Sequence, residues 1–221
     1  MYPPVTGATL GIFGLLLVVL FAFVEVGVIR VTYQRLGISP RIVTLLLFAM
    51  ILGSYLNLPI ATISAPRILE NRIVYFWGMP YVVPGLVYPG RTQLAINVGG
   101  AVIPIGVCVY LLGRFKAYAT SMLATLIVSI VVYWNSRVVP GVGIAVPTII
   151  PGILAAATAY ILDSRRSPAV AYVAGTLGCL LGADIMNLPL VAQMQAPVAS
   201  IGGAGTFDGV FVSGLIAAIL A

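Results

Sequence analysis

Residues Ala117–Trp134 read AYATSMLATLIVSIVVYW, a stretch of 18 residues without a charged side chain. An α-helix rises about 1.5 Å per residue, so a helix of this length covers most of a hydrocarbon core about 30 Å thick. Its few polar groups are Ser, Thr and Tyr hydroxyls, which can be satisfied inside a bundle of helices. The stretch therefore predicts a transmembrane helix.

The rest of the chain has the same character. Of 221 residues, 61% are hydrophobic and 7% are charged, and the mean hydropathy is +1.15. A soluble domain carries about a quarter charged residues. We therefore predict one all-α membrane domain over residues 1–221, a bundle of about seven transmembrane helices. The further apolar runs that predict spans are Leu10–Ile29, Ile42–Ile63, Leu94–Gly113, Val142–Leu162, Pro168–Leu190 and Pro197–Ala221.

Glycine and proline are frequent in three of these runs, and proline kinks or breaks a helix. A bundle of six spans is therefore the alternative. Residues 64–93 are predicted to form an extramembrane or interfacial insertion, either an aromatic anchor or a lid over a site.

The net charge of +6 is distributed in a way that indicates membrane topology rather than a nucleic-acid partner. With seven helices, seven basic residues fall on one side of the membrane and four on the other. Basic loops favour the cytoplasm, so we expect a multi-pass protein of the cell membrane with its N-terminus outside and its C-terminus cytoplasmic. The first side holds Arg30, Arg35, Arg41, Arg114, Lys116, Arg165 and Arg166, and the second holds Arg67, Arg72, Arg91 and Arg137.

Missing residue types exclude several classes of protein. The chain has no histidine, which excludes Ser-His or Cys-His catalysis and His-bound zinc or haem. Its one lysine, Lys116, falls near a predicted loop, so a buried retinal Schiff base is excluded. Cys108 and Cys179 lie inside predicted spans and are expected to be free thiols. We expect neither a cofactor nor a metal.

Two segments of the chain resemble each other and predict an internal repeat, with copies over about 39–113 and 167–221. Each copy has Ser-Pro, an apolar run, Asn-Leu-Pro and then a glycine pair that opens another apolar run. The predicted helices run the same way, so the copies should superpose by rotation about the membrane normal. The landmarks are Ser39-Pro40, Asn57-Leu58-Pro59 and Gly99-Gly100, against Ser167-Pro168, Asn187-Leu188-Pro189 and Gly202-Gly203.

Three asparagines belong to these landmarks or lie beside them, namely Asn57, Asn97 and Asn187. Proline removes a backbone donor and frees carbonyl groups in the preceding turn, and an asparagine amide can satisfy them. The same amides could bind a ligand. We keep both interpretations, a binding role and a role in helix packing, with equal weight.

Two aspartates stand out because a carboxylate inside a membrane is costly unless it is paired, hydrated or protonated. Asp184 and Asp208 are predicted to lie well inside the sixth and seventh helices, at similar depth and within about 7 Å of each other. Two adjoining carboxylates share a proton, which provides a general acid and a general base. The neighbouring Gly203, Gly205 and Thr206 are candidate binding residues.

The motifs around these residues resemble a prokaryotic membrane family catalogued as domain of unknown function 1614. They are Gly182-Ala183-Asp184 with Asn187-Leu188-Pro189, the run from Gly203 to Gly209, and the run from Asn97 to Ala101. The resemblance implies a shared fold and no particular activity.

The chain is also similar to the GxGD intramembrane aspartyl proteases, which place one Asp on each of two consecutive helices. This similarity implies that Asp184 and Asp208 form a catalytic pair. The chain departs from the protease pattern in two respects. Asp208 follows Gly205 by three residues, and no Pro-Ala-Leu follows it.

Three functions remain open on the sequence. An intramembrane aspartic hydrolase would cut a transmembrane polypeptide with the two aspartates. A small transporter or channel would use the same acids to bind a small ion or relay protons. A scaffold would pair them with basic groups of another subunit. In all three cases we expect the protein to be embedded in the lipid bilayer.

Overall fold

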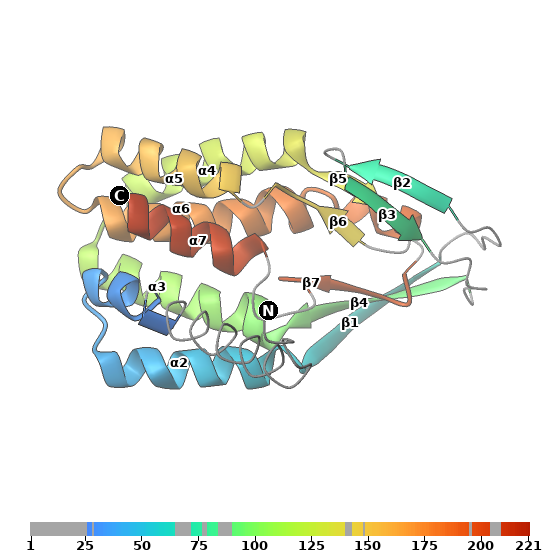
Figure 1. Ribbon diagram of the computed structural model, residues 1–221, viewed down its shortest axis with the longest axis horizontal. Coiled ribbons are helices and arrows are strands. Elements are labelled where there is room, and N and C mark those ends of the chain that lie inside the picture. Colours follow the sequence, from blue (N-terminus) through green and yellow to red (C-terminus); the bar gives the residue numbers. More distant parts are fainter. Residues whose placement is uncertain are drawn as a thin grey trace, which may run out of the picture.

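The computed structural model consists of a bundle of helices at one end and a group of strands at the other (Figure 1). The structure describes residues 26–27, 29–64, 72–76, 79–83, 90–139, 143–147, 149–194, 196–203 and 209–221. The first predicted span, Leu10–Ile29, therefore lies almost wholly outside the described residues.

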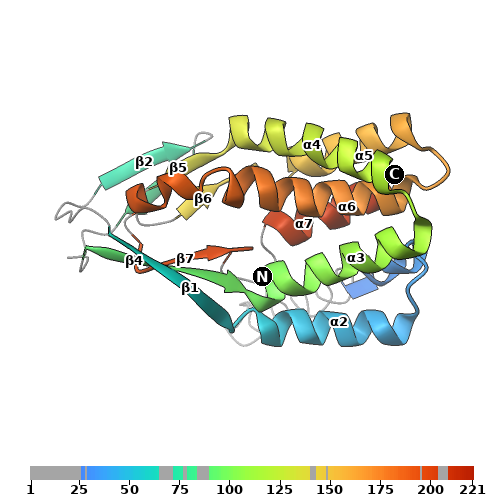
Figure 2. The ribbon, with the colours of Figure 1, turned by 180° about the vertical axis from the view of Figure 1, so that it is seen from behind.

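Among the described residues, six helices of 12 to 18 residues run back and forth along the long axis of the bundle, and residues 29–35 are helical as well (Figures 1 and 2). Two π-helical segments extend them at the strand end: η1 (Val98–Val102) precedes α3, and η2 (Leu180–Ile185) follows α6. The helices are α2 (Pro40–Gly53), α3 (Ile103–Phe115), α4 (Tyr118–Asn135), α5 (Ile149–Leu162), α6 (Ser167–Cys179) and α7 (Gly209–Leu220).

Within the described residues, three helical segments are long and apolar enough to cross a membrane. They are Val98–Phe115, Tyr118–Asn135 and Ser167–Ile185. The other three helices, α2, α5 and α7, are apolar but have only 12 to 14 residues. A mostly helical fold with membrane-length apolar helices agrees with the sequence prediction, whereas a bundle of seven complete spans is not confirmed.

The prediction of an all-α fold is wrong at the strand end of the bundle. Several apolar runs predicted as complete spans are helical only in part and contain strands. The strands are β1 (Asn57–Ser64), β2 (Arg72–Phe76), β3 (Met79–Val83), β4 (Arg91–Asn97), β5 (Arg137–Val139), β6 (Gly143–Ala145) and β7 (Val198–Ile201), and a 3-10 helix, η3, covers Leu188–Gln193. Short apolar runs rich in β-branched residues cannot be assigned to helix or strand by periodicity alone, which explains the error.

The three-stranded sheet has the order β1-β4-β7 and joins distant parts of the chain. β1 pairs antiparallel with β4, and Asn57 lies opposite Asn97. β4 pairs parallel with β7, and Ile96 lies opposite Ile201. The remaining strands form two hairpins, β2-β3 and β5-β6. The sheet thus brings the segment before Gly99-Gly100 beside the segment before Gly202-Gly203.

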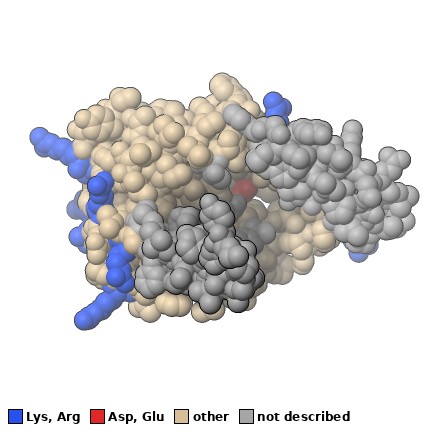
Figure 3. Space-filling model, in the orientation of Figure 1, with Lys and Arg blue, Asp and Glu red and all other residues tan. Residues whose placement is uncertain are grey.

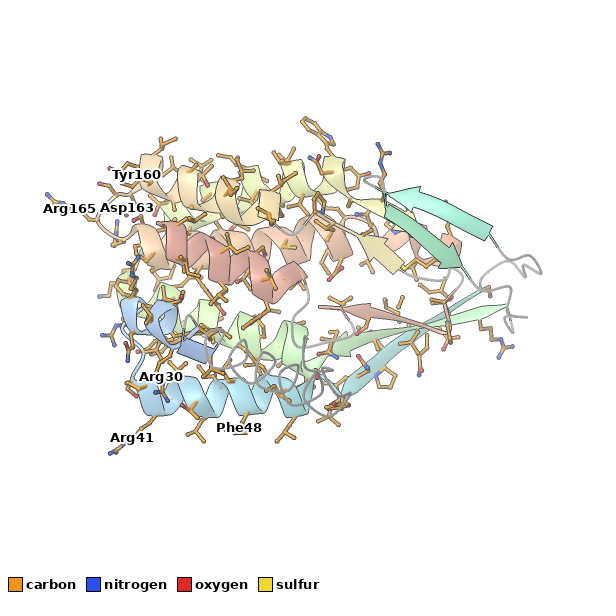
Figure 4. The ribbon with its side chains drawn as sticks, in the orientation of Figure 1. Arg30, Arg41, Phe48, Tyr160, Asp163 and Arg165 are labelled. Atoms are coloured by element: carbon orange, nitrogen blue, oxygen red, sulfur yellow. The ribbon has the colours of Figure 1, made fainter. Side chains whose placement is uncertain are left out.

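Small residues allow the helices to pack closely, as is typical of helices in membranes. A Cβ atom on Gly178 of α6 would lie 2.6 Å from Val128 of α4, and one on Gly175 would lie 2.9 Å from the carbonyl oxygen of Ser213 in α7. Many large apolar side chains are exposed on the outside of the bundle. Phe48 is 61% exposed and points away from the bundle (Figure 4), and Met122 is 78% exposed. This distribution fits a surface covered by lipid.

The internal repeat is not confirmed. Both Ser-Pro pairs do lie at the start of a helix, α2 or α6, and both glycine pairs follow a strand. The helices of the two copies pack differently, however. α6 lies along α7, whereas α2 meets η1 closely at its last turn, where Gly53 approaches Gly99.

Basic residues gather at the end of the bundle away from the strands, shown at the left of Figure 3. Arg30, Arg41 and Arg165 are labelled there in Figure 4. Arg114 and Lys116 follow at the end of α3, and Arg35 contacts the end of α7 through the carbonyl oxygen of Ile219. Arg91 and Arg137 begin strands at the opposite end. The basic residues named here thus lie at two opposite ends of the bundle, whereas Arg67 lies outside the described residues and the orientation in the membrane stays a prediction.

Candidate functional site

Asp184 lies in η2, at the end of the helix that starts with α6. Its Oδ2 atom accepts a hydrogen bond of 2.7 Å from the backbone N–H of Gly202, just after β7. The side chain is half-buried. Space-filling Figure 3 shows an acidic atom in a recess between the helical part and the strand part. A carboxylate held by a backbone N–H is oriented, because one of its oxygens is fixed in place.

Asp184 lies nearer the end of its helix than the sequence predicts. The backbone at Gly182 packs against Val132 of α4, and the amide of Asn187 donates to Ser136 Oγ at 2.9 Å, just beyond the end of α4. Asp184 lies between these two levels, in the last turn of its helix rather than well inside the span. Trp134 at this level is 72% exposed, as an aromatic residue at a membrane interface would be.

The backbone around Asp184 is a π-helix, and so is η1 on the facing side of the site. Such segments are rare and often occur at functional sites. The amide of Asn187 stabilises the end of η2 by donating to the carbonyl oxygens of Gly182 at 3.1 Å and Ala183 at 2.9 Å. Asn187 therefore caps a helix end.

Asn97 is fully buried and joins three elements. Its Oδ1 accepts from the N–H of Gly100 at 2.7 Å, and its Nδ2 donates to Ser54 O at 2.8 Å and to Asn57 Oδ1 at 3.1 Å. Ser200 of β7 also donates to Asn57 Oδ1, at 2.7 Å. The asparagine amides are thus used in packing and capping, which supports the structural interpretation for Asn97.

One glycine of each pair, Gly100 and Gly202, meets the other next to this network. A Cβ atom on Gly100 would overlap the carbonyl oxygen of Gly202, and a Cβ on Gly202 would lie 2.6 Å from the backbone nitrogen of Ala101. Gly202 also has φ +84°, a conformation that glycine adopts without strain. Only glycine allows the two backbones to approach this closely, so these residues position the partner of Asp184.

Of the predicted site residues, Asn57 and Asn97 are hydrogen-bonded to each other, and Asp184 binds Gly202, the neighbour of Gly203. Asn187 follows Asp184 by three residues. Gly203 closes the turn after β7 by donating to Ser200 O at 3.1 Å. Gly205, Thr206 and Asp208 lie outside the described residues, so the predicted distance between the two aspartates stays a prediction. α7 begins at Gly209.

Sequence reasoning missed Ser200 and the backbone N–H of Gly202. Ser200 could have been found only with the strand register, since it reaches Asn57 across the middle strand of the sheet. The described residues contain no group of three Cys, Asp or Glu side chains that could hold a metal ion.

The other described aspartate, Asp163, lies at the opposite end of the bundle (Figure 4). Its Oδ2 accepts a hydrogen bond of 2.7 Å from Arg166 Nε, and this bond lowers the pKa of Asp163 below its usual value. Asp163 is therefore a paired carboxylate at a helix end and provides a comparison for Asp184.

Asp184 also marks the outer edge of the sheet. The N–H of Gln93 in β4 donates to the carbonyl oxygen of Pro197, so the backbone groups of Pro197 face β4. Along a strand, successive residues point their backbone groups to opposite sides, so the N–H groups of Val198, Ser200 and Gly202 face away from β4. Within the described residues β7 is an edge strand. Asp184 binds the last of these three N–H groups, where a further strand would otherwise pair.

Comparison with known proteins places the chain in a family without an assigned activity. No curated protein and no solved structure matches it. The similarity to GxGD aspartyl proteases is therefore not shown. A family model described as "Protein of unknown function (DUF1614)" matches residues 51–220, which is most of the chain. The chain belongs to this family of proteins of unknown function.

Proposed function

We propose that this membrane protein is an aspartic hydrolase that cuts polypeptide at the strand end of its helical bundle. Asp184 would be one catalytic carboxylate and Asp208 the other. The observation that carries the proposal is the position of Asp184, whose carboxylate is fixed by the N–H of Gly202 at the edge of β7. A carboxylate oriented beside an edge strand is well placed to act on an extended peptide.

The edge of β7 supports a specific mode of substrate binding. An extended segment can add to a sheet edge through backbone hydrogen bonds, which bind any sequence. The N–H groups of Val198 and Ser200 face this edge. A peptide aligned along them would pass Asp184, because the same edge continues to Gly202.

The chemistry requires one ionised and one protonated carboxyl group. The carboxylate takes a proton from water as the water oxygen bonds to the peptide carbonyl carbon, and the carboxylic acid gives its proton to the carbonyl oxygen. The two aspartates have then exchanged roles. In the second step the newly protonated aspartic acid gives its proton to the nitrogen as the C–N bond breaks, and the newly ionised aspartate takes the proton of one hydroxyl group of the intermediate. These transfers leave a carboxylic acid and an amine and return both aspartates to their first state.

The core of the bundle favours hydrolysis over transport. Cys108, Leu111, Val128 and Tyr172 are each at most 1% exposed, so the middle of the described bundle is filled by side chains. Asp184 lies at one end of this packed region rather than at its centre. A transporter places its ion site near the middle of the membrane with access to both faces.

Replacing Asp184 with asparagine is expected to abolish cleavage and leave the fold intact. An amide oxygen can still accept from Gly202 N–H, whereas an amide cannot exchange the proton, and such losses cost a factor of about 10² to 10⁴ in rate. The measurement is mass spectrometry of new N-termini in membranes of cells that express each form. Asp163→Asn is the matched control, since it changes an aspartate far from the site.

New N-termini that appear with the unaltered protein and with Asp163→Asn, but not with Asp184→Asn, would support the hydrolase. The same N-termini with all three forms would reject it. Proton or sodium uptake into proteoliposomes that is lost in Asp184→Asn, without any cleavage, would favour the transporter instead.

We also propose that the basic end of the bundle is cytoplasmic, which puts Asp184 near the outer face of the cell membrane. The basic residues that lie at that end, on or beside the helix ends there, are Arg30, Arg35, Arg41, Arg114, Lys116, Arg165 and Arg166. Reporter domains fused after Lys116 and after Arg166 should be active in the cytoplasm. Activity of both reporters outside the cell would reverse the orientation.

A further inference from the structure

In the described part of the chain, the basic end of the bundle carries more positive charge than its acidic residues neutralise. Among the described residues the one ion pair is that of Arg166 with Asp163. Arg166 also donates to Phe115 O at 3.1 Å, and Arg35 donates to Ile219 O at 3.2 Å. These two arginines therefore stabilise helix ends. Arg41, Arg114, Lys116 and Arg165 are exposed and have no ion-pair partner in the described part of the chain.

Arg114 is held in place as well as exposed. Its Nη1 donates to Tyr110 Oη at 2.9 Å, and its guanidinium carbon lies 6.0 Å from the centre of the Tyr110 ring and 5.9 Å from that of Phe115. The guanidinium of Arg114 also packs against Gly37, where the absence of a side chain makes room for it, since a Cβ on Gly37 would lie 3.0 Å from Nη2 of Arg114. A guanidinium held in this way loses less conformational entropy when it binds an anion.

Exposed aromatic side chains accompany these cations. Tyr110, Tyr118 and Tyr160 are 47%, 57% and 65% exposed, and Ile161 beside Tyr160 is 79% exposed. Tyrosines of this kind lie at the level of lipid headgroups, with apolar residues on the hydrocarbon side. The cations on neighbouring turns and loops are thus at headgroup level. They also come from α2, α3 and two separate loops around the end of the bundle.

We propose that this basic end binds the phosphate groups of anionic phospholipids in the adjacent leaflet, through Arg41, Arg114, Lys116 and Arg165. Cations spread around the perimeter fit several lipid headgroups in a shell better than one soluble anion at a single point. Each basic residue near an anionic surface adds a favourable electrostatic contribution that salt weakens. The inference does not depend on the proposed hydrolase activity.

The buried thiols provide a readout for lipid binding. Cys108 and Cys179 are at most 1% exposed, so a thiol-reactive fluorophore should label them only as the protein unfolds. The protein is placed in nanodiscs of phosphatidylcholine alone, or of equal amounts of phosphatidylcholine and phosphatidylglycerol. We expect the anionic lipid to raise the midpoint of thermal unfolding by about 4 °C or more, and about 1 M salt to remove the rise.

Charge-neutral variants separate this site from a general effect of the bilayer. The combined variant Arg41→Gln, Arg114→Gln and Arg165→Gln should lose most of the rise. Arg91→Gln with Arg137→Gln, at the strand end, should keep it. The readout is the difference in unfolding midpoint between the two kinds of nanodisc, measured for each protein. A variant that is less stable in both kinds of nanodisc therefore remains informative. No rise in the unaltered protein, or the same rise in the combined variant, would overturn the proposal.

Discussion

The variant Gly100→Ala is expected to prevent stable folding. The added methyl group would overlap the carbonyl oxygen of Gly202, which belongs to the backbone and cannot turn aside. Relief would require β4 and β7 to separate, with loss of their parallel pairing and of the bond between Gly202 and Asp184. Overpacking costs about 1 to 3 kcal/mol where side chains can adjust and more where they cannot, against a total stability of about 5 to 15 kcal/mol, and here the overlapping atom is backbone.

Gly106→Ala is the matched control, because it makes the same chemical change in the helix that η1 extends. A Cβ at Gly106 would have no neighbour within 4 Å, so the substitution should raise stability by up to about 1 kcal/mol through helix propensity. Both variants can be followed by the yield of monodisperse protein and by thermal labelling of the cysteines. Equal unfolding midpoints for Gly100→Ala and the unaltered protein would show that the two glycine pairs do not meet.

Replacing Asn97 with leucine is expected to cost several kcal/mol. Asn97 is fully buried, and its side chain satisfies the N–H of Gly100 and the carbonyl oxygen of Ser54. Leucine has a similar volume but leaves both backbone groups without these bonds, and each unsatisfied buried group costs about 1 to 3 kcal/mol. The unfolding midpoint should therefore fall steeply.

Asn97→Asp tests which bonds matter. An aspartate keeps the acceptor for Gly100 N–H but loses the donor to Ser54 and Asn57. It also adds a charge that is costly to bury. We expect Asn97→Asp and Asn97→Leu both to be destabilised. If either variant kept full stability and lost only activity, Asn97 would be a binding residue, as one of the two sequence interpretations held.

The sequence predicts a helix best where one apolar run is long and is not interrupted by charged residues. α4 begins and ends within one residue of the predicted span, because Ala117–Trp134 is long and uncharged. The strands could not be predicted in the same way. Asn-Leu-Pro opens a strand at Asn57, whereas Leu188 and Pro189 of the second motif begin a 3-10 helix, so the same three residues adopt different structures in different surroundings.

The candidate site was predictable in part. Asp184 was identifiable because an acid in an apolar run needs a physical explanation. Its partner, the N–H of Gly202, was not, because that contact depends on which backbone groups of β7 face away from β4. The register of two strands far apart in the chain follows from the tertiary fold, and no local pattern encodes it. The position of Asp208 relative to Asp184 stays a prediction.

The parallel pairing of β4 with β7 also sets an order of events during synthesis. Residues 91–97 leave the ribosome long before residues 198–201, and the two strands can pair only when the later one has been made. Contacts between distant segments form late because the intervening chain must first be closed into a loop. The newly made protein therefore passes through a stage in which its helices are inserted while Gly99 and Gly100 still lack their partner strand. During this stage Asp184 also lacks the N–H of Gly202 that orients its carboxylate, so the candidate site is assembled only after β7 has been made.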